Sequence, residues 1–117
     1  SVKIPIPGLG VSNTVRGAMA SWSKTLSMEV GPFGITVNNI LPGFIDTDRL
    51  GGLIQTLSEK QGISKEAVTK NMISTIPAGR FGKPEEIGSL AAFLASDSGA
   101  YINGVSIPVD GGKTGAL

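Results

Sequence analysis

The groups best suited to bind a ligand stand in one short stretch of the sequence, residues 42–47, which reads Pro-Gly-Phe-Ile-Asp-Thr. An apolar, β-branched run precedes this 42–47 segment and stops at Pro-Gly, which predicts a buried strand that ends there. Such an ending leaves free backbone N–H and C=O groups, and the Thr47 hydroxyl, at the carboxyl edge of a sheet. Because open α/β sheets bind their ligands at that edge, we expect the 42–47 segment to bind a ligand.

The chain contains no cysteine and no histidine, which limits its chemistry. Without cysteine there are no disulfides, thiolate nucleophiles or Cys-based zinc sites. Without histidine the commonest general base at neutral pH and the commonest metal ligand are missing. Asp46 and Asp48 flank Thr47 too closely to form a metal cage without other ligands. Acid–base chemistry must therefore come from hydroxyls, carboxylates, Lys or a cofactor, and no metal site is predicted.

The remaining composition is that of an ordinary globular protein, because 117 residues with 40% apolar content suffice for one domain with one core. A net charge of +1 lacks the clustered Lys and Arg of a nucleic-acid-binding surface. No apolar run approaches the roughly 20 residues of a membrane span, and no signal-peptide pattern opens the sequence. We expect no nucleic-acid partner, no membrane partner and a cytoplasmic location.

The first half of the sequence predicts a helix over 11–30 and a buried strand over 34–41. Ser12 or Asn13 is the expected helix N-cap, and Gly31-Pro32 supplies the stop. Apolar residues recur along the helix at spacings of three and four, typical of one packed face. They are Val15, Ala18, Met19, Trp22, Leu26 and Val30.

The second half predicts helices over 48–60, 64–74 and 84–95 and a last strand over 105–109. Ser64 is the expected N-cap of the second of these helices, and Pro84 suits the first position of the third. Asn103-Gly104 turns the chain into the last strand. The expected core face of the helix from Pro84 consists of Ile87, Leu90, Ala91 and Leu94.

This order of helix, strand, helices and strand is typical of the second half of a doubly wound parallel sheet. Two strands cannot form a stable parallel sheet alone, since each needs neighbours and covered faces. We therefore expect residues 1–117 to be the C-terminal half of one α/β domain, whose N-terminal half would precede Ser1.

Residues 37–47 resemble the Val-Asn-x-Ile-x-Pro-Gly-x-Ile-x-Thr signature of the short-chain dehydrogenase/reductase family. Three further stretches are similar to the same family: the helix entry at 79–87, the helix end and turn at 93–104, and the strand end at 109–112. Within the family, the resemblance is strongest to 3-oxoacyl-acyl-carrier-protein reductases. It implies a Rossmann-like three-layer sandwich and a single NAD(P)-binding domain.

The resemblance also implies a cofactor, NAD or NADP, bound by Pro42, Gly43, Ile45, Thr47 and Arg16. The residues that choose between NAD and NADP belong to the first half of the family's domain, so the preference cannot be predicted from residues 1–117. The implied substrate is a small carbonyl compound or an acyl thioester. The implied assembly is a homodimer or homotetramer.

The family's catalytic set is a Ser followed by Tyr-x-x-x-Lys, and this sequence departs from it. The resemblance places Ser12 at the position of the Tyr and Arg16 at that of the Lys. Ser1 resembles the catalytic Ser, although its spacing to Ser12 is shorter than in the family pattern. The only tyrosine is Tyr101, in a distant turn. An aliphatic hydroxyl is far less acidic than a phenol with a pKa of about 10, so Ser12 cannot simply replace the Tyr as proton donor.

Three hypotheses remain from the sequence. The first is an NAD(P)-dependent oxidoreductase in which residues 46–79 form a mobile substrate lid. The second is a non-catalytic family member that keeps the cofactor pocket for binding or regulation, which the missing Tyr favours. The third is a chain that functions only as one half of an assembly with a separate piece of the same protein.

Structural roles compete with the functional ones at several positions. Arg16 is either a solvated helix charge or a ribose contact, and Thr47 is either a helix N-cap or a cofactor contact. One of Asn38 and Asn39 is expected to brace the loop after the strand, because buried amides need partners. The aromatic residues expected in a core or an interface are Trp22 and Phe93, and the acidic residues expected to complement a helix dipole are Glu85 and Glu86.

Overall fold

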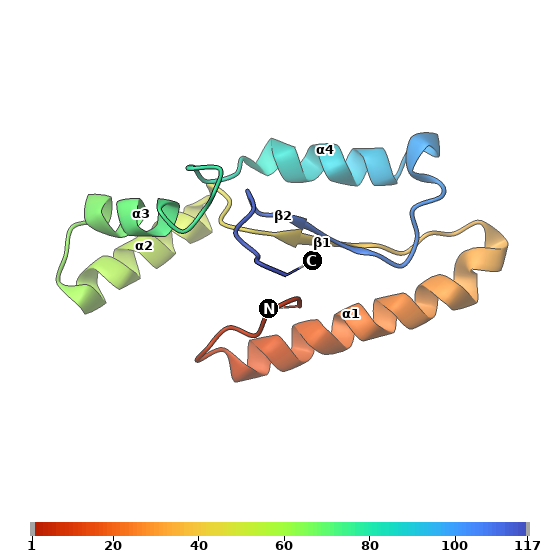
Figure 1. Cartoon of the computed structure of the whole chain (residues 1–117), viewed down its shortest axis with the longest axis horizontal. Helices are drawn as coiled ribbons and strands as arrows, with labels where there is room; N and C mark the ends of the chain where they lie inside the picture. Colours follow the sequence, from red (N-terminus) through yellow and green to blue (C-terminus); the bar gives the residue numbers. More distant parts are fainter. Residues whose placement is uncertain (1, 117) are drawn as a thin grey trace.

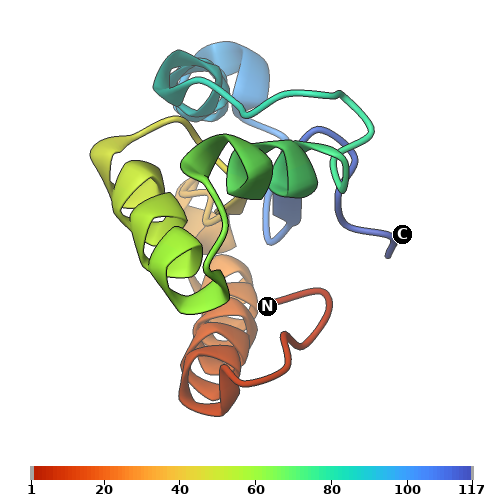
Figure 2. The ribbon, with the colours of Figure 1, turned by 90° about the vertical axis from the view of Figure 1, so that its left-hand side faces the viewer.

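The computed structural model describes residues 2–116 and has three layers. Two parallel strands, β1 (Asn39–Pro42) and β2 (Ser106–Val109), form the middle layer. Helix α4 (Pro84–Leu94) lies on one face of the strands and α1 (Gly10–Val30) on the other (Figures 1 and 2). The predicted parallel α/β arrangement is confirmed.

The connections between these layers carry the remaining elements. A short 3-10 helix, η1 (Gly31–Phe33), follows α1, and a second, η2 (Asp97–Gly99), follows α4. Helices α2 (Asp48–Gln61) and α3 (Lys65–Ile73) pack against each other beyond the carboxyl ends of the strands (Figure 1). Among residues 2–116, no helix has both the length and the apolar character needed to cross a membrane.

Strand β1 pairs with β2 along one edge only. The register runs from Asn39 opposite Ser106 to Pro42 opposite Val109. Because successive residues of a parallel strand turn their N–H and C=O groups to opposite sides, those of Ile40 point away from β2. Within residues 2–116 the sheet contains only these two strands, so the Ile40 edge pairs with no described strand.

The predicted strand over 34–41 is wrong in its first half, because side-chain amides replace strand pairing there. Asn103 accepts a hydrogen bond from Val37 N at 2.8 Å and donates one to Ser27 O at 3.0 Å. Gly104 adopts φ 70°, and a Cβ there would lie 2.5 Å from Ser27 Oγ. The Asn-Gly turn therefore fastens the segment before β1 to the end of α1.

The expectation that Asn38 or Asn39 braces the loop after β1 is also wrong. Asn38 donates to Ile102 O at 2.8 Å and accepts from Val105 N at 3.3 Å. Asn39 donates to Ser106 Oγ at 3.2 Å. Asn38 thus binds the residues before β2 and Asn39 its first residue, at the opposite end of the strands from the 42–47 segment.

Helix α1 begins earlier than the capping residues predicted. Its first residue is Gly10, and Leu9 occupies the N-cap position without a side-chain cap. Neither Ser12 nor Asn13 is therefore the cap. Asn13 instead accepts from Ile6 N at 3.2 Å and donates to Ile6 O at 2.9 Å, which holds the preceding loop against the first turns of the helix.

The face of α1 that packs toward the strands is polar. Ser23 and Ser27 are 5% and 3% exposed, and Ser23 Oγ lies 3.0 Å from Asn39 Oδ1. By contrast, Val15, Met19 and Trp22 of the predicted packed face are each more than half exposed. These three are therefore not core residues of the described structure, whereas Leu26 and Val30 of the same predicted face are partly buried. Phe93 of α4 is likewise 44% exposed.

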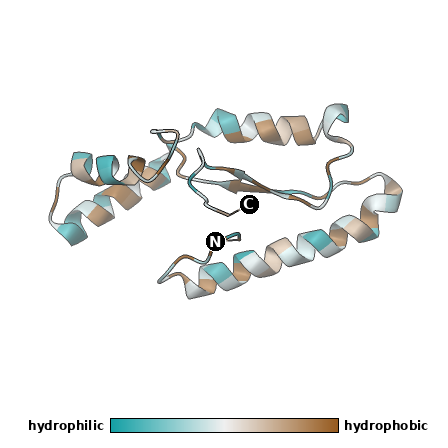
Figure 3. Cartoon of the chain, viewed as in Figure 1, coloured by the Kyte–Doolittle hydropathy of each residue, from teal (hydrophilic) through white to brown (hydrophobic). Residues whose placement is uncertain are grey.

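The other helices agree closely with the predicted bounds. Ser64 caps α3 by accepting a hydrogen bond from Ala67 N at 3.1 Å, and Pro84 occupies the first turn of α4. Helix α4 changes from hydrophilic at its start to hydrophobic toward its end (Figure 3). Ile87, Leu90 and Leu94 are partly buried, whereas Ala91 is exposed, contrary to the expectation of a core position. Among residues 2–116, the buried apolar residues are Leu50, Val68 and Ile76.

Gly43, directly after β1, allows a close approach that no larger residue permits. A Cβ at this position would lie 2.7 Å from both Cα and Cβ of Asp110. We predict that Gly43→Ala destabilises the protein by about 1–3 kcal/mol, the usual range for overpacking. Gly88 is the matched control, since a Cβ there meets nothing within 4 Å and Ala is favoured in a helix by roughly 0.5–1 kcal/mol.

Denaturant unfolding of the two variants measures the difference. A midpoint for Gly43→Ala equal to wild type would contradict the predicted clash.

Candidate binding site at the strand ends

Three segments of the chain meet beyond the carboxyl ends of the strands. Gly43 N donates to Val109 O at 2.9 Å, which continues the pairing by one residue. Gly82 then joins the 42–47 segment, donating to Phe44 O at 2.9 Å and accepting from Asp46 N at 2.8 Å. Because these bonds come from the neighbours of Ile45, its own N–H and C=O point away from Gly82. The Ile45 main chain therefore offers a donor and an acceptor on the outer side of the segment.

A small cavity lies inside this junction. Its volume is about 90 Å³, below the ~300–1,000 Å³ of a typical ligand pocket. A ligand of dinucleotide size would not fit inside this cavity. The lining residues are Phe44, Ile45, Ala78, Arg80, Gly82, Glu86, Val109, Asp110 and Gly111.

Thr47 occupies the N-cap position of α2 but does not cap it with its side chain. Its backbone is extended, with φ −146° and ψ 163°, and its hydroxyl donates to Ile45 O at 3.3 Å. The Thr47 oxygen keeps its lone pairs and is exposed. The hydroxyl is therefore available to accept a hydrogen bond from a ligand, beside the outward-facing groups of Ile45.

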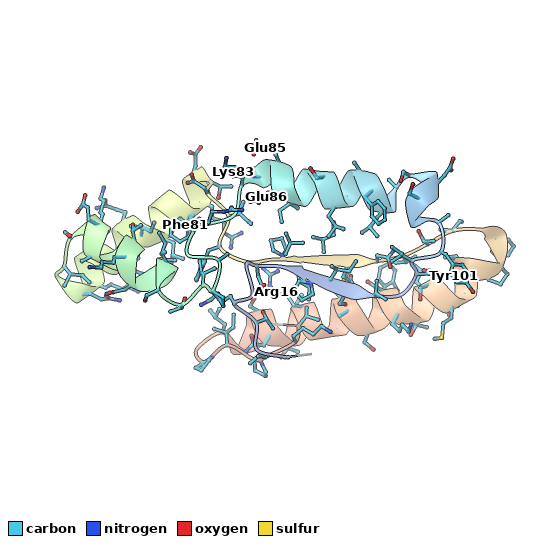
Figure 4. All side chains as sticks on the ribbon, turned by 45° about the horizontal axis from the view of Figure 1, so that its top comes forward. Arg16, Phe81, Lys83, Glu85, Glu86 and Tyr101 are labelled. Carbon is cyan, nitrogen blue, oxygen red and sulfur yellow. The ribbon has the colours of Figure 1, made fainter. Side chains whose placement is uncertain are left out.

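Ser12 and Arg16 lie together in the first turns of α1. Arg16 Nε donates to Ser12 Oγ at 3.0 Å, and the Arg16 side chain is exposed. This part of α1 lies at the same end of the molecule as the carboxyl ends of the strands (Figures 1 and 4). Among the described residues, neither side chain hydrogen-bonds to the 42–47 segment. Ser1, the third predicted catalytic residue, lies outside the described residues.

Tyr101 does not take the place of the missing Tyr. It is fully exposed and lies far along the molecule from Arg16, toward the end where α1 finishes (Figure 4). The structure therefore brings no phenol to the strand ends within residues 2–116.

An ion pair joins residues on either side of Gly82 in the sequence. The Arg80 guanidinium contacts both carboxylate oxygens of Glu86, at 2.6 and 2.9 Å, and Glu86 also accepts from Lys83 N at 2.7 Å. Arg80, followed by the Lys83 amide, lowers the pKa of Glu86 to about 2. Glu86 therefore does more than complement the helix dipole, because it positions the loop that holds the 42–47 segment. Figure 4 shows Glu85 and Glu86 at the start of α4.

Two contacts here were not predicted from the sequence. One is the ion pair between Arg80 and Glu86. The sequence did contain a signal for it, because Arg80 stands six positions before Glu86 in the acidic first turn of a predicted helix. The other is Lys113, whose ammonium lies 4.9 Å from the centroid of the Phe44 ring. No local pattern indicates that second contact, because its partners are distant in sequence.

Comparison with known proteins decides the family. The chain is 39% identical over 111 residues to the NADPH-dependent reductase BacG of Bacillus subtilis, covering 95% of this chain and 43% of that protein. A family model described as enoyl-(acyl carrier protein) reductase matches residues 1–114. A solved short chain dehydrogenase family protein from Francisella tularensis superposes with a TM-score of 0.90 at 34% identity, over 96% of this chain and 46% of that one.

The chain belongs to the short-chain dehydrogenase/reductase family. A further relative is the 3-oxoacyl-[acyl-carrier-protein] reductase FabG of Pseudomonas aeruginosa, 41% identical over 97 residues, or 83% of this chain and 35% of the relative. The chain thus spans less than half the length of these short-chain dehydrogenase/reductase proteins. The predicted Rossmann-like fold is confirmed for the part that it spans.

We predict that Glu86→Gln makes the stability of the protein less dependent on pH at acidic values. The folded pKa of Glu86, about 2, lies below its ordinary value of 4.5. The ion pair therefore stabilises the fold fully above about pH 4.5, and this contribution is lost as the pH falls toward 2. Thermal unfolding from pH 2 to 6 measures the effect.

Glu85→Gln is the control, since the described residues give Glu85 no salt bridge. Equal flattening of the pH profile by both variants would contradict a specific role of Glu86.

Proposed function

We propose that the protein containing this chain is an NAD(P)-dependent oxidoreductase that interconverts a small carbonyl compound and its alcohol. The observation that carries the proposal is the outer side of the 42–47 segment. There, the Ile45 N–H and C=O face outward, and the Thr47 hydroxyl, which donates to Ile45 O, keeps the capacity to accept a hydrogen bond. Under this proposal residues 1–117 are the C-terminal part of a single NAD(P)-binding domain.

The residues present fit the nicotinamide end of such a cofactor. A carboxamide has one acceptor oxygen and two donor hydrogens, and it would match the N–H and C=O of Ile45 and the oxygen of Thr47. Pro42 and Gly43 would form the turn behind this contact. The family relatives described as NADPH-dependent support the choice of a nicotinamide dinucleotide. Such a cofactor supplies a hydride when bound.

Arg16 and Ser12 would serve the carbonyl and the ribose. Arg16 uses Nε to hold Ser12, so its terminal nitrogens are left to donate to ribose hydroxyls. Because Ser12 Oγ accepts from Arg16, its own hydrogen is directed elsewhere and can bond a carbonyl oxygen. Ser12 would then orient and polarise the carbonyl. It would transfer a proton poorly, since an aliphatic hydroxyl is far less acidic than a phenol.

The presence of Ser12 and Arg16 in place of the family's Tyr and Lys favours a second candidate function. This second candidate is a family member that binds the cofactor without efficient catalysis. Both candidate functions use the same binding surface on the 42–47 segment. They differ in whether the side chains at positions 12 and 16 support catalysis. The substrate class for the catalytic candidate is a carbonyl compound or an acyl thioester, supported by the similarity to FabG.

We predict that the full-length protein binds a nicotinamide dinucleotide but turns over ordinary ketones slowly. General acid catalysis contributes typically 10²–10⁴-fold, so turnover should lie below that of Tyr-containing relatives by about this factor. Ser12→Tyr combined with Arg16→Lys should raise it. Fluorescence titration measures cofactor binding, and NAD(P)H oxidation over a panel of ketones and acyl thioesters measures turnover.

Ser21→Tyr with Thr25→Lys is the matched control, because it adds the same side chains at the same spacing on an exposed part of α1. Turnover of wild type at the level of Tyr-containing relatives would mean that another proton donor acts. Absence of dinucleotide binding would overturn the proposal itself.

We also propose that the protein assembles as a homodimer or homotetramer through α1. Gly17 and Ala18 are exposed small residues that let another helix approach closely, whereas Ala20 is partly covered on the strand side. Exposed Val15 and Trp22 add apolar surface to the same helix. An isologous helix pair across a two-fold axis would cover such a surface.

We predict that Ala18→Trp shifts the protein toward a smaller assembly in sedimentation velocity experiments. The reason is steric, since the indole separates helices that small residues allow to touch. Lys60→Trp, on the exposed side of α2, controls for added bulk. An unchanged sedimentation coefficient for Ala18→Trp would exclude this face as the interface.

A further inference from the structure

Hydrogen bonds hold the backbone of the turn after β2, which carries Lys113. The Asp110 carboxylate accepts from Gly112 N and from Thr114 N, both at 2.9 Å. Ala78 N donates to Gly111 O at 3.0 Å, which ties the turn to the loop after α3. Burial raises the pKa of Asp110, but the hydrogen bonds from Thr114, Gly112 and Lys113 outweigh it and hold that pKa below its ordinary value. The carboxylate is therefore a charged acceptor at neutral pH.

The Lys113 ammonium has neutral partners only. It donates to Thr75 Oγ1 at 2.6 Å and lies 4.9 Å from the centroid of the Phe44 ring. Within residues 2–116, the only salt bridge is the Arg80–Glu86 pair. An ammonium has three donor hydrogens, so Lys113 keeps donor capacity and a positive charge that no described carboxylate balances.

A groove of about 220 Å³ opens beside this ammonium, between α2, α3 and the turn. For scale, an apolar cavity of about 150 Å³ accepts benzene. Lys113 is the only charged residue among those lining the groove. The others are Phe44, Leu57, Gln61, Val68, Asn71, Met72 and Thr75.

We propose that this groove binds a small carboxylate with an apolar body. The body would rest against Phe44, Leu57 and Met72, and the carboxylate would pair with Lys113 and accept from Asn71 or Gln61. Such a ligand matches the lining in two ways. Its apolar body buries apolar surface of the groove, which is favourable, and its carboxylate forms a charge-assisted hydrogen bond with the single ammonium.

The groove adjoins the candidate site, because Phe44 also lines the small cavity behind the 42–47 segment. If the proposed oxidoreductase function holds, on which this step rests, the substrate is a carbonyl compound that carries a carboxylate. Lys113 would then be a specificity residue that holds the acid group while the carbonyl faces the strand ends.

Hexanoate and 1-hexanol test the groove, because they share an apolar body and differ in the anionic group. Binding of each to the full-length protein is measured by isothermal titration calorimetry for wild type, Lys113→Gln and Lys70→Gln. Lys70 is an exposed lysine of α3 that does not line the groove.

We expect Lys113→Gln to weaken hexanoate binding about tenfold, the size of one charge-assisted hydrogen bond, and to leave 1-hexanol binding unchanged. Lys70→Gln should change neither. Equal loss of hexanoate binding in both lysine variants, or no loss in Lys113→Gln, overturns the inference.

Titration of the same proteins with NADPH and with NADH separates this inference from the proposed function. If hexanoate binding depends on Lys113 but neither dinucleotide binds, the inference about the groove is supported and the proposed oxidoreductase function is overturned. If a dinucleotide binds but hexanoate binding does not depend on Lys113, the inference about the groove is overturned and the proposed oxidoreductase function is kept.

Discussion

The close approach of Gly43 to Asp110 determines the geometry of everything beyond the strands. Just after the last paired residues of the two parallel strands, a side chain at Gly43 would collide with Asp110. From this contact, one segment leads outward to α2 and the other folds back as the turn that carries Lys113. The contact between Gly43 and Asp110 thereby positions the groups that follow on both segments. These are the Phe44 ring, the outward N–H and C=O of Ile45, the Thr47 hydroxyl and the Lys113 ammonium.

Much of this arrangement could be predicted because its determinants are local. Ser64 and Pro84 start helices through their own backbone neighbourhood, and Pro-Gly ends a strand wherever it stands. The positions of Ile45 and Thr47 follow from the same short motif. The partners of Asn38 and Asn103 could not be predicted, since they lie 64 or more positions away. Lys113 meets Thr75, 38 positions away, for the same reason.

The exposed apolar residues of α1 illustrate a different limit. Spacing predicts that Val15, Met19 and Trp22 share a helix face, and it indicates that the face is packed. It cannot indicate against what. The strand side of α1 carries Ser23, which hydrogen-bonds to Asn39, whereas Val15, Met19 and Trp22 stay more than half exposed in the described structure. A helix with two useful sides gives a pattern that does not say which side meets the sheet.

The amide contacts that precede the strands also bear on how the chain folds. They join residues 64 to 76 positions apart, and α2, α3 and α4 lie between the partners. Helices form from near neighbours, whereas this closure requires the two ends of a long loop to meet. We therefore expect the helices to form early and the parallel pair late. On this view, the slow step of folding is the closure of the long loop, which is complete when Asn38 and Asn103 bind the backbone opposite them.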